Sequence, residues 1–219
     1  NCKKKIGFSI FAVLFASLAF SLNDISIKYF THIMPLHQVV FFRAIIALIF
    51  TLTVFLRLEG GFSALVSKRP VLHLFGGLCL VTANLSFFSG LAIIPLAESS
   101  AIFFISPLLI TGLSILFLGE LVGVRRWAAL FFGLTGVLFI IKPGSIQFTW
   151  AVFLPILAAF AYSIRNIITR KMGLSEKAVT MSFYLHITFI ITCGLMGLFF
   201  GDGKFSGTNN PALEFVFSR

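Results

Sequence analysis

Charged residues are scarce in this sequence, and acidic residues are the scarcest of them. Asp, Glu, Lys and Arg make up 11% of the 219 residues, and only 7 residues are acidic. About 25% of the residues are charged in a typical soluble domain. Here 58% are hydrophobic, and the mean hydropathy is +1.05. These values exclude an ordinary soluble domain and predict an integral membrane protein.

Residues that bind metals or form disulfides are also few. The three cysteines, Cys2, Cys79 and Cys193, are far apart and have no metal-ligand spacing. The sequence contains neither a nucleophile elbow nor a phosphate-binding glycine loop. None of the four histidines has a second ligand at metal-site spacing. We therefore expect no metal, no cofactor and no enzymatic activity. We expect His37 to lie in an outer loop and His73 near the cytoplasmic end of a span.

Seven apolar runs follow one another with short polar breaks. A helix rises 1.5 Å per residue, so about 20 residues cross a hydrocarbon core of about 30 Å. The runs lack the strict alternation of membrane β-strands, and we predict an all-α membrane protein. The expected spans are Ile6–Ile27, Val39–Leu56, Val71–Ile94, Ala97–Leu118, Trp127–Ile141, Trp150–Ile168 and Val179–Phe200.

The basic residues gather in loops on one side of these spans. A net charge of +10 would suggest a nucleic-acid partner for a soluble domain. In membrane proteins, however, Lys and Arg accumulate in cytoplasmic loops. We therefore predict a cytoplasmic N-terminus, contact with membrane lipids and no nucleic-acid partner. The basic residues of this side are Lys3, Lys4, Lys5, Arg57, Lys68, Arg69, Arg125, Arg126, Arg170, Lys171 and Lys177.

The first and sixth spans resemble each other. "ASLAFSLNDISIK" (Ala16–Lys28) aligns with "AAFAYSIRNIITR" (Ala158–Arg170), which matches Ser21 with Ser163 and Asp24 with Asn166. Apolar helices also match by chance, but here the polar positions are in register. Because the second copy begins five spans after the first, an odd number, it would cross the membrane in the opposite direction, as in many secondary transporters. We predict a first five-helix repeat at residues 1–144 and the start of an inverted repeat at 145–219, which together hold seven of ten expected helices.

The first span carries a polar stripe. Ser17, Ser21, Asp24 and Lys28 are spaced four, three and four residues apart, which places them on one face of a helix. Asp24 and Lys28 are one turn apart, with the acid first, in a geometry that favours an ion pair. One interpretation is a structural pair near the outer interface. The other is a pair that lines a substrate pathway, with Ser163 and Asn166 on the opposite wall.

Three further charged residues lie within or at the ends of spans. Arg43 follows "VVFF" in the second span. A guanidinium inside a membrane is costly, so we expect Arg43 to have an acidic partner. Its position is consistent with either a structural clamp or an anion-binding site. Glu98 opens the fourth span and serves either helix capping or gating. Glu120, near Arg125 and Arg126, forms either an interfacial ion pair or an intracellular gate.

Several uncharged residues also suggest specific roles. Asn84 in the third span bonds either a neighbouring helix or a polar solute. Pro107, near the middle of the fourth span, removes a backbone hydrogen bond and predicts a kink. Gly133 and Gly136 suit close helix packing.

These residues resemble the EamA-type family of the drug/metabolite transporter superfamily. The similarity is carried by "NDISIKYF", "FFRAIIALI", "LSFFSGLAIIPLAESSAIFFISPLLITGLSILFLGE" and "RRWAALFFGLTGVLFIIKPG". It implies a ten-helix carrier built from two inverted five-helix repeats around a central cavity. It also places Lys28, Arg43, Pro107 and Glu120 at positions characteristic of the family.

From this resemblance we expect a secondary transporter of a bacterial inner (plasma) membrane. It would export small polar or amphipathic metabolites, such as amino acids, by alternating access. No ATPase motif occurs, so coupling would come from protons or solute gradients, with Asp24 or Glu98 as the carboxylates to test. The alternatives are a membrane-embedded enzyme acting on lipids and a non-transporting scaffold. The sequence does not indicate an oligomeric state.

Overall fold

The computed structural model describes residues 14, 18, 21–22, 25–27, 29–30, 34–55, 65–67, 69–141, 150–173 and 175–200. All regular structure in these residues is helical, as predicted. A π-helical turn (η1, Thr51–Phe55) follows α2, and a 3-10 turn (η3, Trp150–Val152) precedes α8. The α-helices are α2 (Leu36–Phe50), α4 (Pro70–Leu91), α5 (Leu96–Phe103), α6 (Ser106–Leu118), α7 (Val124–Ile141), α8 (Phe153–Met172) and α9 (Ala178–Phe200).

Five helical stretches in this part of the chain are long and apolar enough to cross a membrane, so this is a multi-pass membrane protein. They overlap the predicted second, third, fourth, sixth and seventh spans. The predicted fifth span lies within α7, and most of the first lies outside the described residues. The stretches are Leu36–Thr53, Pro70–Leu91, Leu96–Leu118, Trp150–Met172 and Ala178–Phe199.

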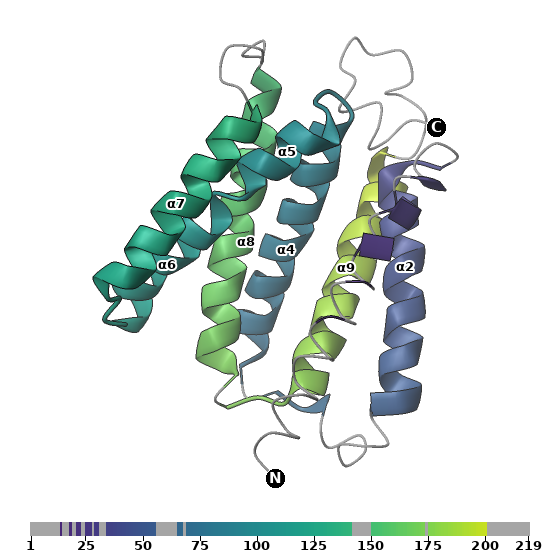
Figure 1. Ribbon diagram of the computed structural model, residues 1–219. Helices are drawn as coiled ribbons and strands as arrows, with labels where there is room; N and C mark the ends of the chain where they lie inside the picture. Colours follow the sequence, from purple (N-terminus) through teal and green to yellow (C-terminus); the bar gives the residue numbers. More distant parts are fainter. Residues whose placement is uncertain are drawn as a thin grey trace.

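Helix α4 is the centre of the packing (Figure 1). It packs most extensively against α8 and then against α9, while α2 packs against the other side of α9 and α6 packs against α8. The main hydrophobic core joins Val40 and Ala44 of α2, Val81 of α4, and Phe189 and Cys193 of α9. Helices from the beginning and the end of the chain therefore share one core.

Glycines on α4 allow this close packing. A Cβ atom at Gly76 would lie 3.3 Å from Cγ2 of Ile168 on α8, and one at Gly77 would lie 2.7–2.9 Å from the side chain of Thr188 on α9. Small residues commonly let helix backbones approach in membranes. Gly133 and Gly136, by contrast, are exposed on α7, and an added Cβ would meet nothing within 4 Å. Our expectation that they mediate close packing is wrong within the described residues.

The fourth span is not one continuous helix. It breaks at Phe104 and Ile105, and α6 then begins with Pro107 in its first turn. Proline has no N–H to continue the helical ladder, and the predicted kink lies between α5 and α6, where Phe104 and Ile105 keep right-handed helical backbone angles. Figure 1 shows α5 at an angle to α6 near one end of the bundle. The start of α6 lies beside α8, where the Ser106 carbonyl accepts a hydrogen bond from Ser163.

Candidate functional site

Six of the described basic residues lie at helix ends or in connecting segments at one end of the bundle, which we call the basic end. The chain passes through this end before α4, between α6 and α7, and between α8 and α9, at the bottom of Figure 1. The helices that meet here come from both predicted repeats. The residues that define the basic end are Arg69, Arg125, Arg126, Arg170, Lys171 and Lys177.

Glu120 and Arg170 link the two predicted repeats at the basic end. Gly119 adopts a left-handed conformation (φ 68°) that ends α6, and its N–H donates to the Ile115 carbonyl. This turn directs Glu120 toward α8, where Arg170 Nη1 lies 3.3 Å from Glu120 Oε2. The Glu120 side chain is 37% exposed and the Arg170 side chain is 40% exposed. The partner is therefore Arg170, and not Arg125 or Arg126 as expected from the sequence.

Ser163 joins α8 to the break in the fourth span. Its side chain is completely buried, and its single hydroxyl proton is shared between the Ala159 carbonyl, at 2.6 Å from the hydroxyl oxygen, and the Ser106 carbonyl, at 3.2 Å. Pro107 lies beside Ser106, and its own carbonyl accepts a bond from the Thr111 hydroxyl at 2.8 Å. Polar groups thus bond the irregular backbone where the helix is interrupted, as membrane helices require.

Replacing Ser163 with valine is expected to lower stability by about 1–3 kcal/mol, because the change removes both bonds and adds a methyl group at a fully packed position. Thermal unfolding in detergent, followed by near-UV circular dichroism, measures the effect. Thr135→Val is the matched control, because it removes only a bond to the Phe131 carbonyl of the same helix. Equal losses in the two variants would contradict a special role for the contact between α6 and α8.

The two asparagines lie on the most extensively packed pair of helices. Asn84 on α4 donates to the Leu80 carbonyl at 3.2 Å, and Asn166 on α8 donates to the Tyr162 carbonyl at 2.9 Å. Both are half-buried. Each side chain thus bonds its own helix, and whether it also contacts a solute stays a prediction.

An aromatic row connects α4, α5 and α8. The ring centroids of Phe87 and Phe103 are 5.3 Å apart, and those of Phe103 and Tyr162 are 5.4 Å apart. These separations are typical of stabilising aromatic contacts. The row fixes the short helix α5 against the central pair α4 and α8, a contact that the sequence patterns did not reveal.

Arg43 lies where α2 meets α9. It is half-buried, and its guanidinium carbon lies 5.7 Å from the centroid of the Phe189 ring, in cation–π geometry. His37, on the same helix, is buried against α9 beside Gly197 and is not in a loop, as we had expected. The sequence placed Arg43 within a span correctly, but its neighbour Phe189 depends on the packing of α2 against α9.

The remaining predicted site residues are dispersed. Glu98 lies in the first turn of α5 and is half-buried. Ser21 is helical and exposed. Asp24 and Lys28 lie outside the described residues, so the polar stripe of the first span stays a prediction. In the described part of the chain, no three His, Cys, Asp or Glu residues lie close enough to hold a metal ion.

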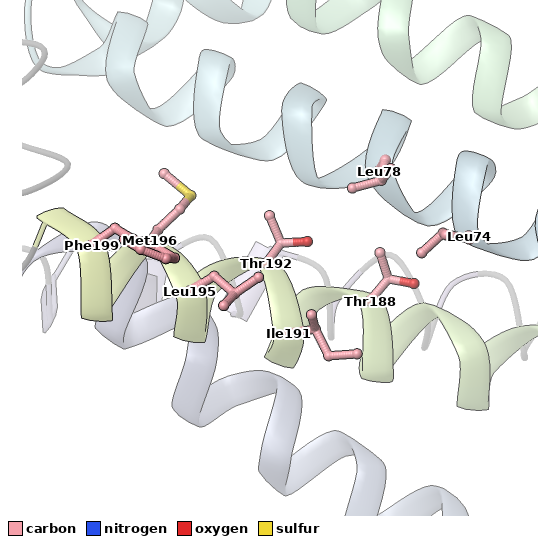
Figure 2. A pocket seen from close by; sticks show the side chains of 8 residues that line it. All are labelled: Leu74, Leu78, Thr188, Ile191, Thr192, Leu195, Met196 and Phe199. Carbon is pink, nitrogen blue, oxygen red and sulfur yellow. The ribbon is translucent and has the colours of Figure 1, made fainter.

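A groove of about 380 Å³ runs between α4 and α9. Figure 2 shows Leu74 and Leu78 on α4 facing Thr188, Thr192 and Met196 on α9. Ile191, Leu195 and Phe199 complete its lining. The volume falls within the usual range for small-molecule sites, and the walls are apolar except for the two threonine hydroxyls. Five of its eight lining side chains are exposed apolar residues, so the groove is open and apolar.

Comparison with known proteins places the sequence in a family. The model of the EamA-like transporter family matches residues 7–142. A riboflavin transporter of Rhizobium johnstonii is 31% identical over 175 residues, which cover 79% of this chain and 57% of the relative. An S-adenosylmethionine uptake transporter of Rickettsia felis is 30% identical over 172 residues, covering 78% of this chain and 58% of the relative.

A pseudopaline exporter of Pseudomonas aeruginosa is more distant, at 27% identity over 190 residues, covering 85% of this chain and 65% of the relative. No solved structure matches. The chain spans a little more than half the length of the first two relatives. All three relatives are named as transporters and none as an enzyme. With the family model matching more than half of its residues, the chain belongs to the EamA-like transporter family.

Proposed function

We propose that this protein moves small polar or amphipathic metabolites across a bacterial inner membrane by alternating access between two inverted repeats. Membership in a transporter family carries this proposal. The packing supports it, because α4 of the first predicted repeat contacts both α8 and α9 of the second. Substrate sites in inverted-repeat transporters lie at such an interface. The N-terminus would be cytoplasmic, as the basic loops predict.

The spacing of the repeat extends into the second helix of each half. The match of Ala16 with Ala158 sets an offset of 142 residues (158 − 16), and the same offset pairs Phe41 with Phe183 and Ile45 with Ile187. These paired residues lie on α2 and α9, which pack against each other. Contact between equivalent helices is expected close to a pseudo-twofold axis, and this supports an inverted repeat.

The groove and the polar residues around α4 suit an amphipathic solute. The apolar part would occupy the groove, near Thr188 and Thr192. Its polar part would contact residues of the pathway, for which Asn84, Asn166 and Arg43 are proposed. A gate is proposed at Glu120, and Glu98 would act near the opposite end of the bundle. Asp24 and Lys28 would extend the pathway along the first span.

The names of the relatives guide the choice of substrates to test. They include riboflavin, S-adenosylmethionine and pseudopaline, and they cover both uptake and export. We propose that this protein exports its substrate. The first compounds to test are these three and the amino acids. The relatives give no support to the alternative of an enzyme acting on lipids.

Counterflow in proteoliposomes tests the function. Vesicles loaded with an unlabelled compound are expected to accumulate the labelled compound transiently and saturably, because an alternating carrier exchanges solute across the membrane. Thr192→Trp fills the groove and is expected to reduce the initial rate about tenfold. Leu116→Trp, at an exposed position on α6 outside the groove, is the control and should retain the parent rate. The tenfold change corresponds to about 1.4 kcal/mol.

The outcomes separate the competing functions. Flux equal to that of empty vesicles for every compound would support a non-transporting scaffold and contradict the proposal. Equal rates in the two tryptophan variants would show that the groove does not bind substrate. Flux in vesicles sorted by protein orientation distinguishes export from uptake.

A further inference from the structure

A half-buried arginine lies inside the bundle, outside the residues discussed so far. Arg165 belongs to α8, and Met172 ends this helix at the basic end, about 10 Å further along. The side chain lies where α8 of the second predicted repeat packs against α4 of the first. An ionisable group at this depth is costly in a membrane and commonly marks a functional site.

The guanidinium of Arg165 has few partners. Its Nη1 donates to the Thr169 hydroxyl, one turn further along α8, and this hydroxyl donates to the Arg165 carbonyl at 2.8 Å. The first of these bonds uses one of the five N–H donors of an arginine. Neither ion pair within the described residues includes Arg165. The positive charge and most of its donors are therefore not committed to an acidic side chain in that part of the chain.

Arg165 and Thr169 line a small cavity between α4, α8 and α9. Its volume is about 20 Å³, enough for one water molecule. The wall on α4 includes His73, whose Nε2 is buried and makes no hydrogen bond in the part of the chain that the structure describes. A neutral imidazole can donate or accept a bond there. A cation, a hydroxyl and an imidazole thus meet at one cavity between the two predicted repeats.

The electrostatics of this cavity favour an anion. Arg165 is the charged residue among those that line it. The carboxylate of Glu176 is close to His73, with 4.0 Å between Oε2 and Nε2, but it does not line the cavity. Its other oxygen, Oε1, accepts a bond from the Ser67 hydroxyl at 3.0 Å. The acid is thus held by other groups and leaves the guanidinium facing the cavity.

The cavity adjoins the apolar groove between α4 and α9. His73 and Leu74, which are neighbours on α4, line the cavity and the groove, respectively. Gly77 lines the cavity, and an added Cβ there would lie 2.7–2.9 Å from Thr188, which lines the groove (Figure 2). The contact between Gly77 and Thr188 therefore separates the two spaces. One amphipathic molecule can occupy both spaces when this contact opens.

We propose that Arg165 binds the anionic oxygen group, a carboxylate or a phosphate, of the metabolite that this transporter moves. The guanidinium forms two parallel hydrogen bonds with such a group, a geometry that lysine cannot match. Thr169 positions the guanidinium, and His73 Nε2 supplies a further donor. The cavity admits only one water molecule in the present conformation, so the group enters when the repeats separate there. Met172 and Met181 also line the cavity, and their flexible side chains can repack.

The inference rests on the proposed transport function, but binding to the purified full-length protein in detergent tests the site without transport. Isothermal titration calorimetry compares two pairs of compounds that differ in one charged group. The pairs are riboflavin 5′-phosphate with riboflavin, and N-acetylphenylalanine with N-acetylphenylalaninamide. At least one anion is expected to bind at least about tenfold more tightly than its neutral partner, because a guanidinium pairs strongly with anionic oxygen. The pair that shows this preference distinguishes phosphate from carboxylate.

Variants of two cations on α8 separate a specific site from overall charge. Arg165→Gln should remove the preference and keep the affinity for the neutral partner, which also shows that the variant is folded. If Arg165→Gln does not fold, Arg165→Lys decides, because loss of the second parallel bond should lower the preference at least about threefold. Lys171→Gln makes the same change of charge at an exposed position and should keep the full preference.

The outcomes also separate this site from the transport function. The proposal is wrong if the parent protein prefers neither anion, if Arg165→Gln keeps the preference, or if Lys171→Gln loses it equally. A preference that depends on Arg165, without saturable flux in proteoliposomes, means that the transport function fails and the anion site stands. Saturable flux with equal affinities within both pairs gives the reverse conclusion.

Discussion

Replacing Gly77 with valine is expected to prevent α4 and α9 from packing at their present distance. Even a Cβ atom at this position would lie 2.7–2.9 Å from Thr188, closer than van der Waals contact allows. The helices would have to separate along the central interface, at a cost of about 3 kcal/mol, the upper end of typical overpacking penalties. The folded fraction after heating, measured by size-exclusion chromatography in detergent, reports this loss.

Two controls isolate the cause of that effect. Gly133→Val makes the same chemical change on α7, where an added Cβ meets nothing within 4 Å, and is expected to change stability by less than about 0.5 kcal/mol. The milder variant Gly77→Ala should be rescued by Thr188→Gly, because every close atom belongs to the Thr188 side chain. If Gly77→Val is as stable as Gly133→Val, the close approach of α4 and α9 is wrong.

Reversing the charge of Arg170 with Arg170→Glu is expected to lower counterflow about tenfold, within the usual range of coupling between conformational states. Two carboxylates would then face each other where an ion pair is 3.3 Å long, which opposes closure of the basic end. The stability of the fold should change by less than about 1 kcal/mol, because both side chains are more than one-third exposed and solvent screens the pair. Initial rates and unfolding midpoints measured on the same samples separate the two effects.

A variant with the same charge change provides the control. Arg125→Glu alters the net charge equally at the start of α7, and Arg125 is one of the partners for Glu120 that the sequence suggested. It should leave the rate unchanged, and the double variant Glu120→Arg/Arg170→Glu should restore at least half of the lost rate because it rebuilds the pair in reverse. If Arg125→Glu is as harmful as Arg170→Glu, the cause is the total charge of the basic end and not the pair.

Much of the fold follows from the sequence alone. Hydropathy sets where helices enter and leave the membrane, and the last predicted span, Val179–Phe200, differs from α9 by one residue at its start. Pro107 also acts locally, since a missing N–H interrupts the hydrogen-bond ladder when proline lies in the interior of a helical span. The family could be recognised because its motifs are continuous in the chain.

The site partners depended on the tertiary structure. Glu120 has arginines five and six residues away in sequence, yet Gly119 turns it toward Arg170, 50 residues away. His73 and Glu176 are more than 100 residues apart, and no spacing rule connects them. Gly77 and Gly133 both lie in apolar helices, and the sequence does not distinguish them. Of the two, only Gly77 closely contacts another helix.

The sequence by itself determined the membrane environment, most of the span boundaries and the family of this protein. These depend on composition, on local backbone chemistry and on continuous motifs. Only the tertiary structure decided which charges pair, which glycines lie at contacts and where the groove runs. The physical reason is that apolar helices of similar composition can pack in many arrangements, and only the packing of α4 against α8 and α9 brings distant side chains within a few ångströms.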